Sequence, residues 1–279
     1  MKKHHAGTIL MLMFFLAGAL VFLYPTISDW IAQKTSRVEI EQYNAVVSDM
    51  TDAQSAKMLE QTQEYNEKLS GSAITDPFSD TSSSTDSNDY DSLLDMSNSI
   101  MAYIEIPSIN VYLPIYHGTD SETLEKGAGH IQGTSLPVGG KGTHAVIAGH
   151  TGLPGKMLFT NLEQLQNGDT FIIHVLGKEL TYQVDQILVV EPDDTSALQI
   201  DSNKDYVTLL TCTPYGVNTH RLLVRGVRVE DAQKTDTVSG TSHTSHLHFV
   251  ISTLFLLVFL AGIHHFRNKF LIGGKHYET

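Results

Sequence analysis

Hydrophobic and polar residues alternate along the middle of the chain with the period of two that is typical of β-strands. Between residues 109 and 115, Ile109, Val111, Leu113 and Ile115 occupy one face of such a strand. Further strands are expected at Ala102–Ile106, Thr143–Ala148, Thr170–Leu176, Leu180–Val190, Tyr206–Cys212 and Arg221–Val229, and short helices at Ser121–Lys126 and Lys156–Leu165. Many short strands separated by glycine and proline turns indicate a mainly β domain over residues 99–230, either a closed barrel or a sandwich.

Two long apolar stretches flank this domain. Gly7–Tyr24 carries no charge and follows Lys2 and Lys3. A secretory signal peptide begins in the same way, but residues 24–26 make a poor cleavage site, which favours a retained transmembrane helix at residues 7–24. Leu247–Ile263 is near the lower length limit for crossing a bilayer. A buried core helix is the alternative for this second stretch, and the basic tail after it argues against that.

Basic residues lie on the outer side of both apolar stretches. Lysines precede the first stretch, and Arg267, Lys269 and Lys275 follow the second. Because basic flanks stay in the cytoplasm, residues 1–6 and 264–279 are expected to be cytoplasmic and the region between the two helices extracellular. The sequence thus predicts a two-pass protein of the cell membrane.

Three polar segments connect the membrane helices to the β domain. Residues 25–70 carry apolar side chains near helical spacing and are expected to form a helix or helix pair that packs on the domain. Residues 71–98 contain six aspartates and no lysine or arginine, a composition that predicts a solvated linker, above all at residues 79–88. Residues 231–246 form a second polar linker.

The charge of the chain narrows the range of partners. The formal net charge is −13 at pH 7. Without the five basic residues at the two ends and Glu278, residues 25–246 hold 13 basic and 30 acidic residues, a net charge of about −17. Such a surface does not suit nucleic acid, which binds basic patches. The histidines are concentrated near the membrane boundaries and two adjacent aspartates are too few for calcium, so no metal and no cofactor are expected.

Cys212 is the only cysteine in the chain. A single thiol forms no internal disulfide, and outside the cell it is open to oxidation. The ordinary role of a lone cysteine is that of a buried small hydrophobe. Cys212, however, lies where a predicted strand ends in a Thr-Pro-Tyr-Gly turn, and such rims are where barrels carry chemistry. The chemical interpretation is a nucleophile assisted by a histidine and a cation.

Two residues are candidates to assist the thiol. Arg221 begins the strand after the turn, and an antiparallel pair would bring it within about 5 Å of Cys212. His150 follows a predicted strand and precedes a Thr-Gly-Leu-Pro loop, whereas His144 and His174 lie inside strands, where structural histidines are usual. His150 is therefore preferred, with His144 as the second choice.

Three segments resemble the sortases, the membrane-bound cysteine transpeptidases of Gram-positive bacteria. Residues 208–212 (Thr-Leu-Leu-Thr-Cys), with Arg221, resemble the active-site signature of that family, and residues 142–154 and 159–162 resemble its histidine segment. Asp76-Pro77-Phe78 resembles the aromatic lid of the class C sortases, which polymerise pilins. The resemblance covers residues 99–230 and the lid, and it selects an eight-stranded barrel over a sandwich.

The resemblance also implies a reaction. Cys212 would attack the Thr–Gly peptide of an LPXTG-like sorting signal on a pilin or surface protein, and His150 would give a proton to the departing amine. Arg221 would hold the substrate carbonyl, with Thr211 as a candidate for further oxyanion support. A lysine amine of the next pilin would then resolve the thioacyl enzyme. The oligomeric state is left open.

The lid implied by the resemblance would place Phe78 over Cys212 and pair Asp76 with Arg221. Two other functions remain open at this point. One is a sortase that attaches surface proteins to cell-wall peptidoglycan. The other is a non-enzymatic, membrane-tethered barrel that binds a partner. That second alternative predicts an inert thiol, whereas an enzyme predicts a reactive one.

Overall fold

The computed structural model describes residues 2–69, 76–78, 88–96 and 98–229. The predicted linker at 231–246, the second membrane helix at 247–263 and the tail at 264–279 therefore lie outside the described residues. Residues 79–87 of the other predicted linker lie outside them as well.

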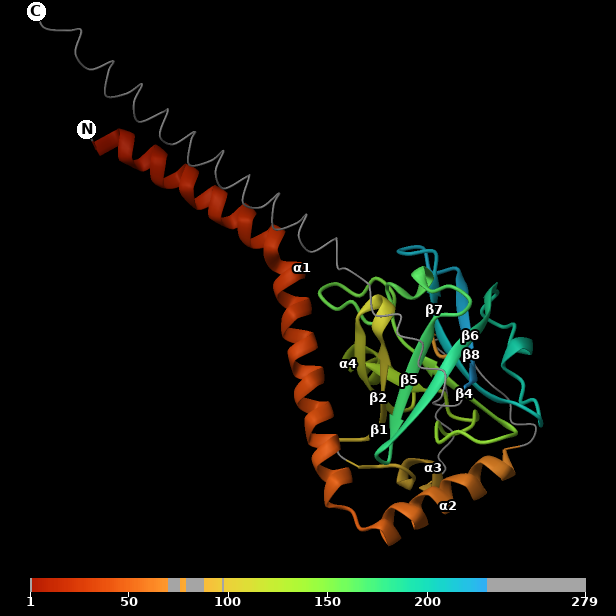
Figure 1. Ribbon diagram of the computed structural model, residues 1–279. Coiled ribbons are helices and arrows are strands. Elements are labelled where there is room, and N and C mark those ends of the chain that lie inside the picture. Colours follow the sequence, from red (N-terminus) through yellow and green to blue (C-terminus); the bar gives the residue numbers. More distant parts are fainter. Residues whose placement is uncertain (1, 70–75, 79–87, 97, 230–279) are drawn as a thin grey trace, which may run out of the picture. The chain divides into compact units, whose positions relative to one another are not determined.

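Eight strands close into a barrel in the order β1-β2-β3-β4-β7-β8-β6-β5 (Figure 1). Most neighbours are antiparallel, but β2 pairs with β3, and β4 with β7, in parallel. The strands are β1 Ile100–Ile106, β2 Val111–His117, β3 Ala128–His130, β4 Thr143–Ala148, β5 Thr170–Val175, β6 Lys178–Val190, β7 Asp205–Thr213 and β8 His220–Arg228. The predicted eight-stranded barrel is confirmed.

The two shortest elements of the barrel differ from the predictions. Strand β3 was not among the predicted strands, because its three residues include Gly129 and show no alternation. A Cβ atom at Gly129 would lie 2.3 Å from the carbonyl oxygen of Gly118, so a glycine is needed for this close approach. Ile109 was placed in a strand, but it belongs to a 3-10 turn, Pro107–Ile109, that separates β1 from β2.

The predicted helix at Lys156–Leu165 is wrong, apart from a 3-10 turn at Leu162–Gln164. In an α-helix each amide donates to the carbonyl four residues earlier. Here the Met157 amide donates to the Asp29 carboxylate (2.9 Å), and the Phe159 amide donates to the His150 carbonyl (3.1 Å). Partners outside the expected helix thus hold the segment as a loop.

The wall formed by β4, β7 and β8 is buried on both faces. Side chains that point into the barrel, such as Ile147, Leu209 and Val224, belong to the main core. Alternate residues of the same strands, among them Leu210 and Leu223, form a separate apolar cluster on the outside. Because side chains alternate along a strand, this two-sided burial explains why these strands are continuous apolar runs in the sequence.

The long helix α1 (Lys2–Asp49) runs through the predicted membrane helix and the start of the predicted N-terminal segment, with Pro25 inside it. The boundary expected at residues 24–25 is therefore not a helix end. Tyr43 anchors the distal half of α1 to the barrel, since its hydroxyl donates to the Met101 carbonyl (3.3 Å) and accepts from the Leu176 amide (3.0 Å). Within the described part of the chain, α1 is the one helix long and apolar enough to cross a membrane.

The second helix, α2 (Asp52–Lys68), begins with a capping box formed by Thr51 and Gln54. Near its end, Asn66 donates to the Leu136 carbonyl (3.1 Å) and accepts from the Leu136 amide (2.7 Å). Of the two expected possibilities, one helix or a helix pair, the structure has the pair, whose first member is the end of α1.

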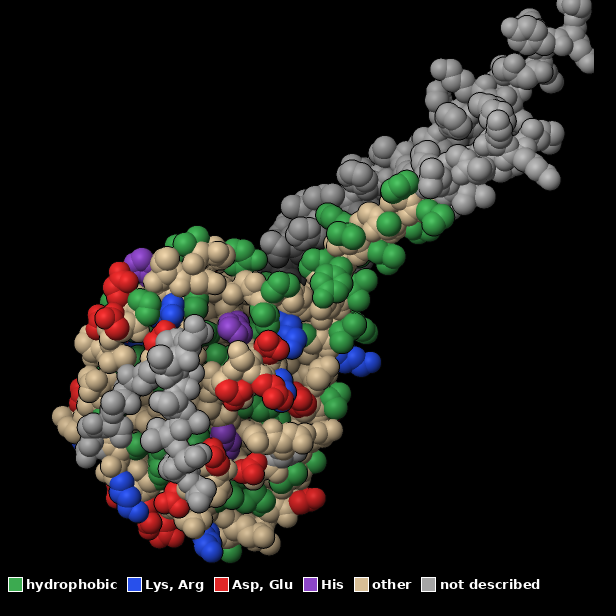
Figure 2. All heavy atoms as spheres, turned by 180° about the vertical axis from the view of Figure 1, so that it is seen from behind, with side chains coloured by type: hydrophobic (Ala, Val, Ile, Leu, Met, Phe, Trp, Pro, Cys, Tyr) green, Lys and Arg blue, Asp and Glu red, His purple; other side chains and the backbone are tan. Residues whose placement is uncertain are grey.

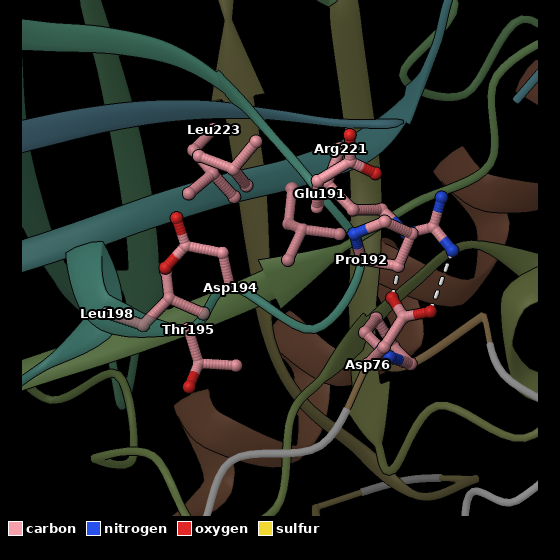
Figure 3. Close-up of a pocket in the computed structure, with 11 residues that line it drawn as sticks. Asp76, Glu191, Pro192, Asp194, Thr195, Leu198, Arg221 and Leu223 are labelled. Atoms are coloured by element: carbon pink, nitrogen blue, oxygen red, sulfur yellow. Dashed lines mark hydrogen bonds and ion pairs between the residues drawn. The ribbon is translucent and has the colours of Figure 1, made fainter. Parts of the chain in front are cut away.

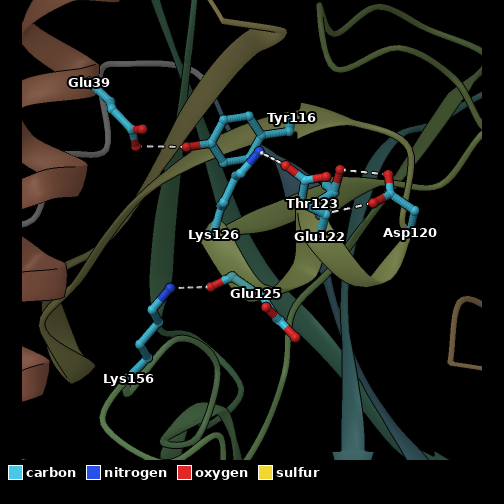
Figure 4. Close-up of polar contacts among 8 residues, drawn as sticks. All are labelled: Glu39, Tyr116, Asp120, Glu122, Thr123, Glu125, Lys126 and Lys156. Carbon is cyan, nitrogen blue, oxygen red and sulfur yellow. Dashed lines mark hydrogen bonds and ion pairs between the residues drawn. The ribbon is translucent and has the colours of Figure 1, made fainter.

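Two short helices lie close to the barrel. Helix α4 (Ser121–Lys126) was predicted, and its cap is the Asp120 carboxylate, which accepts from the Thr123 amide at 3.0 Å (Figure 4). Helix α3 (Asn88–Ser92) lies in a segment predicted as linker. Its Tyr90 is buried, and the hydroxyl lies 2.9 Å from a ring nitrogen of His130. Tyr90 and the fully buried Leu94, which follows the helix, thus fasten this polar segment to the barrel.

Replacing Asn66 with alanine should lower the free energy of unfolding by about 1–3 kcal/mol, because the buried Leu136 amide loses its partner and the Leu136 carbonyl keeps only its bond from the Val138 amide. Denaturant unfolding of the full chain in detergent measures the change. Asn44→Ala is the matched control, since Asn44 is exposed on α1. Equal stability losses in the two variants would show that the Asn66 contacts do not fasten α2 to the barrel.

Candidate active site

The pairing of β7 with β8 places Cys212 directly opposite Arg221. Partners in an antiparallel pair point to the same face of the sheet. For this pair the face is the outside of the barrel, because Cys212 shares its face with Leu210, and Arg221 shares its face with Leu223. Both residues are buried, with exposures of 8% and 7%. The predicted thiol–cation pair is therefore brought together on the outer wall.

The pairing of β4 with β7 brings His150 to the same place. The two strands are parallel, with Ala148 beside Leu210, and the Gly149 amide continues the ladder by donating to the Leu210 carbonyl (3.0 Å). Two further residues along each strand, the next positions on the same face are His150 and Cys212. The register thus places the thiol and the guanidinium side by side on β7 and β8, and His150 two residues beyond the end of the neighbouring strand β4.

Thr211 points to the other face of β7 and fastens this arrangement. Its hydroxyl donates to the Gly149 carbonyl at 2.6 Å, which holds the end of the histidine segment against the cysteine strand. Gly149 is needed at this point, because a Cβ atom there would lie 2.7 Å from the Phe159 ring. The suggested role of Thr211 in oxyanion support remains a prediction.

Asp76, Pro77 and Phe78, the predicted lid (called the lid below), lie against these residues. The Asp76 carboxylate accepts two hydrogen bonds from Arg221, from Nε and Nη2, each 2.7 Å long (Figure 3). The Phe78 ring lies 5.3 Å from the Arg221 guanidinium carbon and 5.4 Å from the centre of the His150 ring. Phe78 also packs against the outer apolar cluster. The lid therefore contacts both residues that the register places beside Cys212.

Next to the lid is a small pocket between the outer wall and the loop that joins β6 to β7 (Figure 3). Leu198, Leu210 and Leu223 provide apolar lining, and Asp76 and Arg221 close one side. The rest of the lining comes from Pro77, Val190, Glu191, Pro192, Asp194 and Thr195. No motif in the sequence marks this loop as part of a pocket. Its one local feature is Pro192, which follows the long strand β6.

Burial sets the protonation chemistry of the closed site. It raises the pKa of the Cys212 thiol, an effect that the Arg221 charge opposes and Asp76 reinforces. Burial also lowers the pKa of His150, with Glu125 acting weakly in the other direction. Both shifts favour a neutral thiol and a neutral imidazole over an ion pair. The hydrogen bond to Asp76 raises the pKa of Arg221, which keeps it charged.

The competing histidines have structural partners elsewhere. His144, the second choice, contacts the Thr208 hydroxyl (2.7 Å) and the Gln199 carbonyl (3.0 Å) through its two ring nitrogens. His130 is fully buried, and burial lowers its pKa to about 4. His174 stacks on Tyr103 with ring centres 4.3 Å apart. The preference for His150 agrees with these contacts.

A closed barrel with a lone thiol beside a half-buried imidazole and a guanidinium has the arrangement of a cysteine acyl-transfer enzyme. The Sortase domain model matches residues 104–229. The solved structure of sortase C-1 from Actinomyces oris is 50% identical, with a TM-score of 0.60, and the match covers 63% of this chain and 98% of that one. The chain belongs to the sortase family of cysteine transpeptidases.

Other similar proteins are also sortases. Sortase C of Streptococcus pneumoniae is 44% identical, with a TM-score of 0.62, and the match covers 68% of this chain and 96% of that one. Sortase D of Bacillus subtilis strain 168 is 33% identical over 129 residues, which are 45% of this chain and 62% of that protein. The chain thus matches less than two thirds of that curated relative's length.

Replacing Asp76 and Phe78 together with alanine should raise the rate at which a small thiol reagent modifies Cys212, by about tenfold or more at neutral pH. Removing the ring admits water, and removing the carboxylate takes away a negative charge, so the pKa of Cys212 falls and the thiolate fraction rises. The rate measured against pH should shift its midpoint downward.

Asp185→Ala is the control for this variant. Asp185 forms the same kind of double hydrogen bond with Arg225 (3.0 and 2.8 Å) farther along β8, so its loss should leave Cys212 reactivity unchanged. If the lid variant reacted no faster than Asp185→Ala, the lid would not shield the thiol.

Proposed function

We propose that this protein is a membrane-anchored cysteine transpeptidase that assembles pilins. It cleaves an LPXTG-like sorting signal between Thr and Gly and joins the acyl product to a lysine amine of another pilin subunit. The observation that carries the proposal is the Cys212–Arg221 pair on the outer wall with Asp76 bound to the same guanidinium. Two similar solved structures support it: the sortase C of Streptococcus pneumoniae, whose structure bears on pilin substrate specificity, and a pilus-related sortase C of Group B Streptococcus.

The first half of the reaction forms a thioester. The Cys212 sulfur bonds to the threonine carbonyl carbon while its proton passes to His150, and the carbonyl oxygen becomes an oxyanion beside Arg221. A cation aimed at developing negative charge in a dry site stabilises the transition state strongly. The C–N bond then breaks, and the imidazolium returns its proton to the departing glycine amine.

The second half transfers the acyl group. A lysine amine attacks the thioester carbon, and His150 removes a proton from the attacking nitrogen. The C–S bond breaks, and the sulfur leaves with its electron pair to recover a proton from His150. Atoms and charges balance over the cycle, with a new amide as product and the enzyme unchanged.

The lid acts as a gate in this proposal. While Asp76 occupies the Arg221 guanidinium, a substrate carbonyl has no access to it. Displacing the lid admits water and removes a carboxylate, and both changes move the pKa of Cys212 down. Substrate entry thus uncovers the thiol and makes it more nucleophilic in the same step.

Alanine in place of Cys212, His150 or Arg221 should each lower the transpeptidation rate by at least about 100-fold, because groups that act as a unit lose activity together. The assay joins a sorting-signal peptide to a pilin lysine. Arg225→Ala and His174→Ala are controls of matching residue type on other parts of the barrel, and each should retain activity within a few-fold.

Full activity of the Cys212→Ala protein would sink the enzymatic proposal. The same assay with a peptidoglycan precursor as the amine distinguishes the rival function, since a wall-anchoring sortase would prefer that acceptor to pilin lysine.

The anchored topology should place residues 25–246 outside the cell. This topology is supported by the uncharged apolar stretch in α1 and by the lysines that precede it, because basic flanks favour an N-terminus in the cytoplasm. Protease added to intact protoplasts should degrade the middle of the chain and spare the tail after Ile263. Release of a soluble protein cut near Pro25 would contradict this topology.

A further inference from the structure

The loop that follows His150 is fastened to the part of α1 just beyond its apolar stretch. The Met157 amide donates to Asp29 Oδ1 at 2.9 Å, and the other oxygen of Asp29 accepts from Gln33 at 2.7 Å. Gly155 packs so closely on α1 that a Cβ atom there would lie 2.3 Å from the Ser28 hydroxyl oxygen. The histidine loop, residues 150–158, is thus clamped to a defined height on the helix.

That height is close to the end of the apolar stretch. Ser28 is four residues beyond Tyr24, and an α-helix rises 1.5 Å per residue, so the clamp lies about 6 Å farther along the helix. The headgroup layer on each side of a bilayer is about 5–8 Å thick. If Tyr24 marks the edge of the hydrocarbon, the clamp lies at headgroup depth.

The side chains around the clamp suit that environment. Tyr24, Ile27, Trp30 and Ile31 are 49–63% exposed on α1, and Met157 at the loop is 41% exposed. In Figure 2, hydrophobic side chains line the part of α1 that extends from the barrel. Exposed apolar side chains and a tryptophan at one level are typical of a protein surface in the membrane interface.

Two charged groups at the clamp, one from α1 and one from the loop, are already engaged within the protein. Both oxygens of Asp29 accept hydrogen bonds, and the Lys156 ammonium donates to the Glu125 carbonyl (Figure 4). The exposed side chain at the clamp is therefore an apolar one, Met157, which is 41% exposed and lies next to the clamped part of α1.

We infer that the histidine loop is a membrane-contact element, with Met157 inserted into the outer headgroup region of the lipid bilayer beside Ile27 and Ile31. The inference rests on the proposed anchoring through α1. It places the His150 end of the catalytic groove at the membrane surface, so that substrates reach Cys212 along the bilayer.

The chain contains a single tryptophan, Trp30, which makes fluorescence a direct test. The full-length protein is reconstituted into nanodiscs of phosphatidylcholine and phosphatidylglycerol, with or without bromine on the acyl chains. Met157→Trp in a Trp30→Phe background reports on the loop. Val46→Trp in the same background is the control, because Val46 is similarly exposed (38%) on α1 but lies about 33 Å beyond Tyr24.

Brominated lipid should reduce the emission of the tryptophan at position 157 by about twofold or more and leave that at position 46 unchanged. Equal quenching at both positions, or none at position 157, would overturn the inference. The unmodified chain separates the two proposals. Incorporation of that chain into the nanodiscs, together with an unquenched tryptophan at position 157 in the variant, refutes loop contact and leaves the anchor intact, whereas failure of that chain to incorporate refutes the anchor and the loop contact together.

Discussion

The parallel pairing of β4 with β7 is the constraint on which the site depends. It matches Ala148 to Leu210, and the antiparallel partner β8 matches Arg221 to Cys212. A slip of one residue in either register would turn a whole strand over, because side chains alternate between faces. The thiol, imidazole and guanidinium therefore meet in this register alone, and the Thr211–Gly149 hydrogen bond helps to fix it.

Two-sided burial of the same wall gives the site its electrostatic character. The inner faces of β4, β7 and β8 belong to the main core, and their outer faces belong to the cluster that Phe78 covers. Charge is costly in such surroundings unless it is paired. Arg221 meets that requirement through Asp76, whereas the thiol and His150 meet it by remaining neutral. The Asp76 carboxylate and the exclusion of solvent thus both raise the pKa of Cys212.

The sequence predicted the parts of the molecule that follow local rules. Alternating runs and continuous apolar runs located seven strands within a few residues, and the strand-end positions of Cys212 and His150 identified candidate site residues. Strand β3 escaped because three residues around Gly129 carry no periodicity. Residues 156–161 match a helical pattern but form a loop, because their amides bond to α1 and to His150. These partners are distant in sequence, so no local pattern reveals them.

The small pocket beside the lid was not predicted. Its lining combines the loop around Pro192 with Leu210 and Leu223, residues that a linear reading assigns to the core. Leu210 and Leu223 face outward because of the way β7 pairs with β8 in the barrel. This pairing depends on the tertiary structure and cannot be derived from the local sequence. Tertiary pairing, rather than composition, decides which apolar residues line the groove.

The ion pair between Asp76 and Arg221 affects the substrate affinity that an experiment on the intact protein measures. In the proposed mechanism, the Asp76 carboxylate competes with the substrate for the Arg221 guanidinium from within the same chain, at an effective concentration on the order of millimolar for a short linker. Dilution does not weaken a competitor of this kind. The substrate affinity measured for the intact protein is therefore the intrinsic affinity divided by a constant factor, which is set by the chain and is the same at every enzyme concentration. Changing the length of the tether, rather than the chemistry of the groove, would reset that factor.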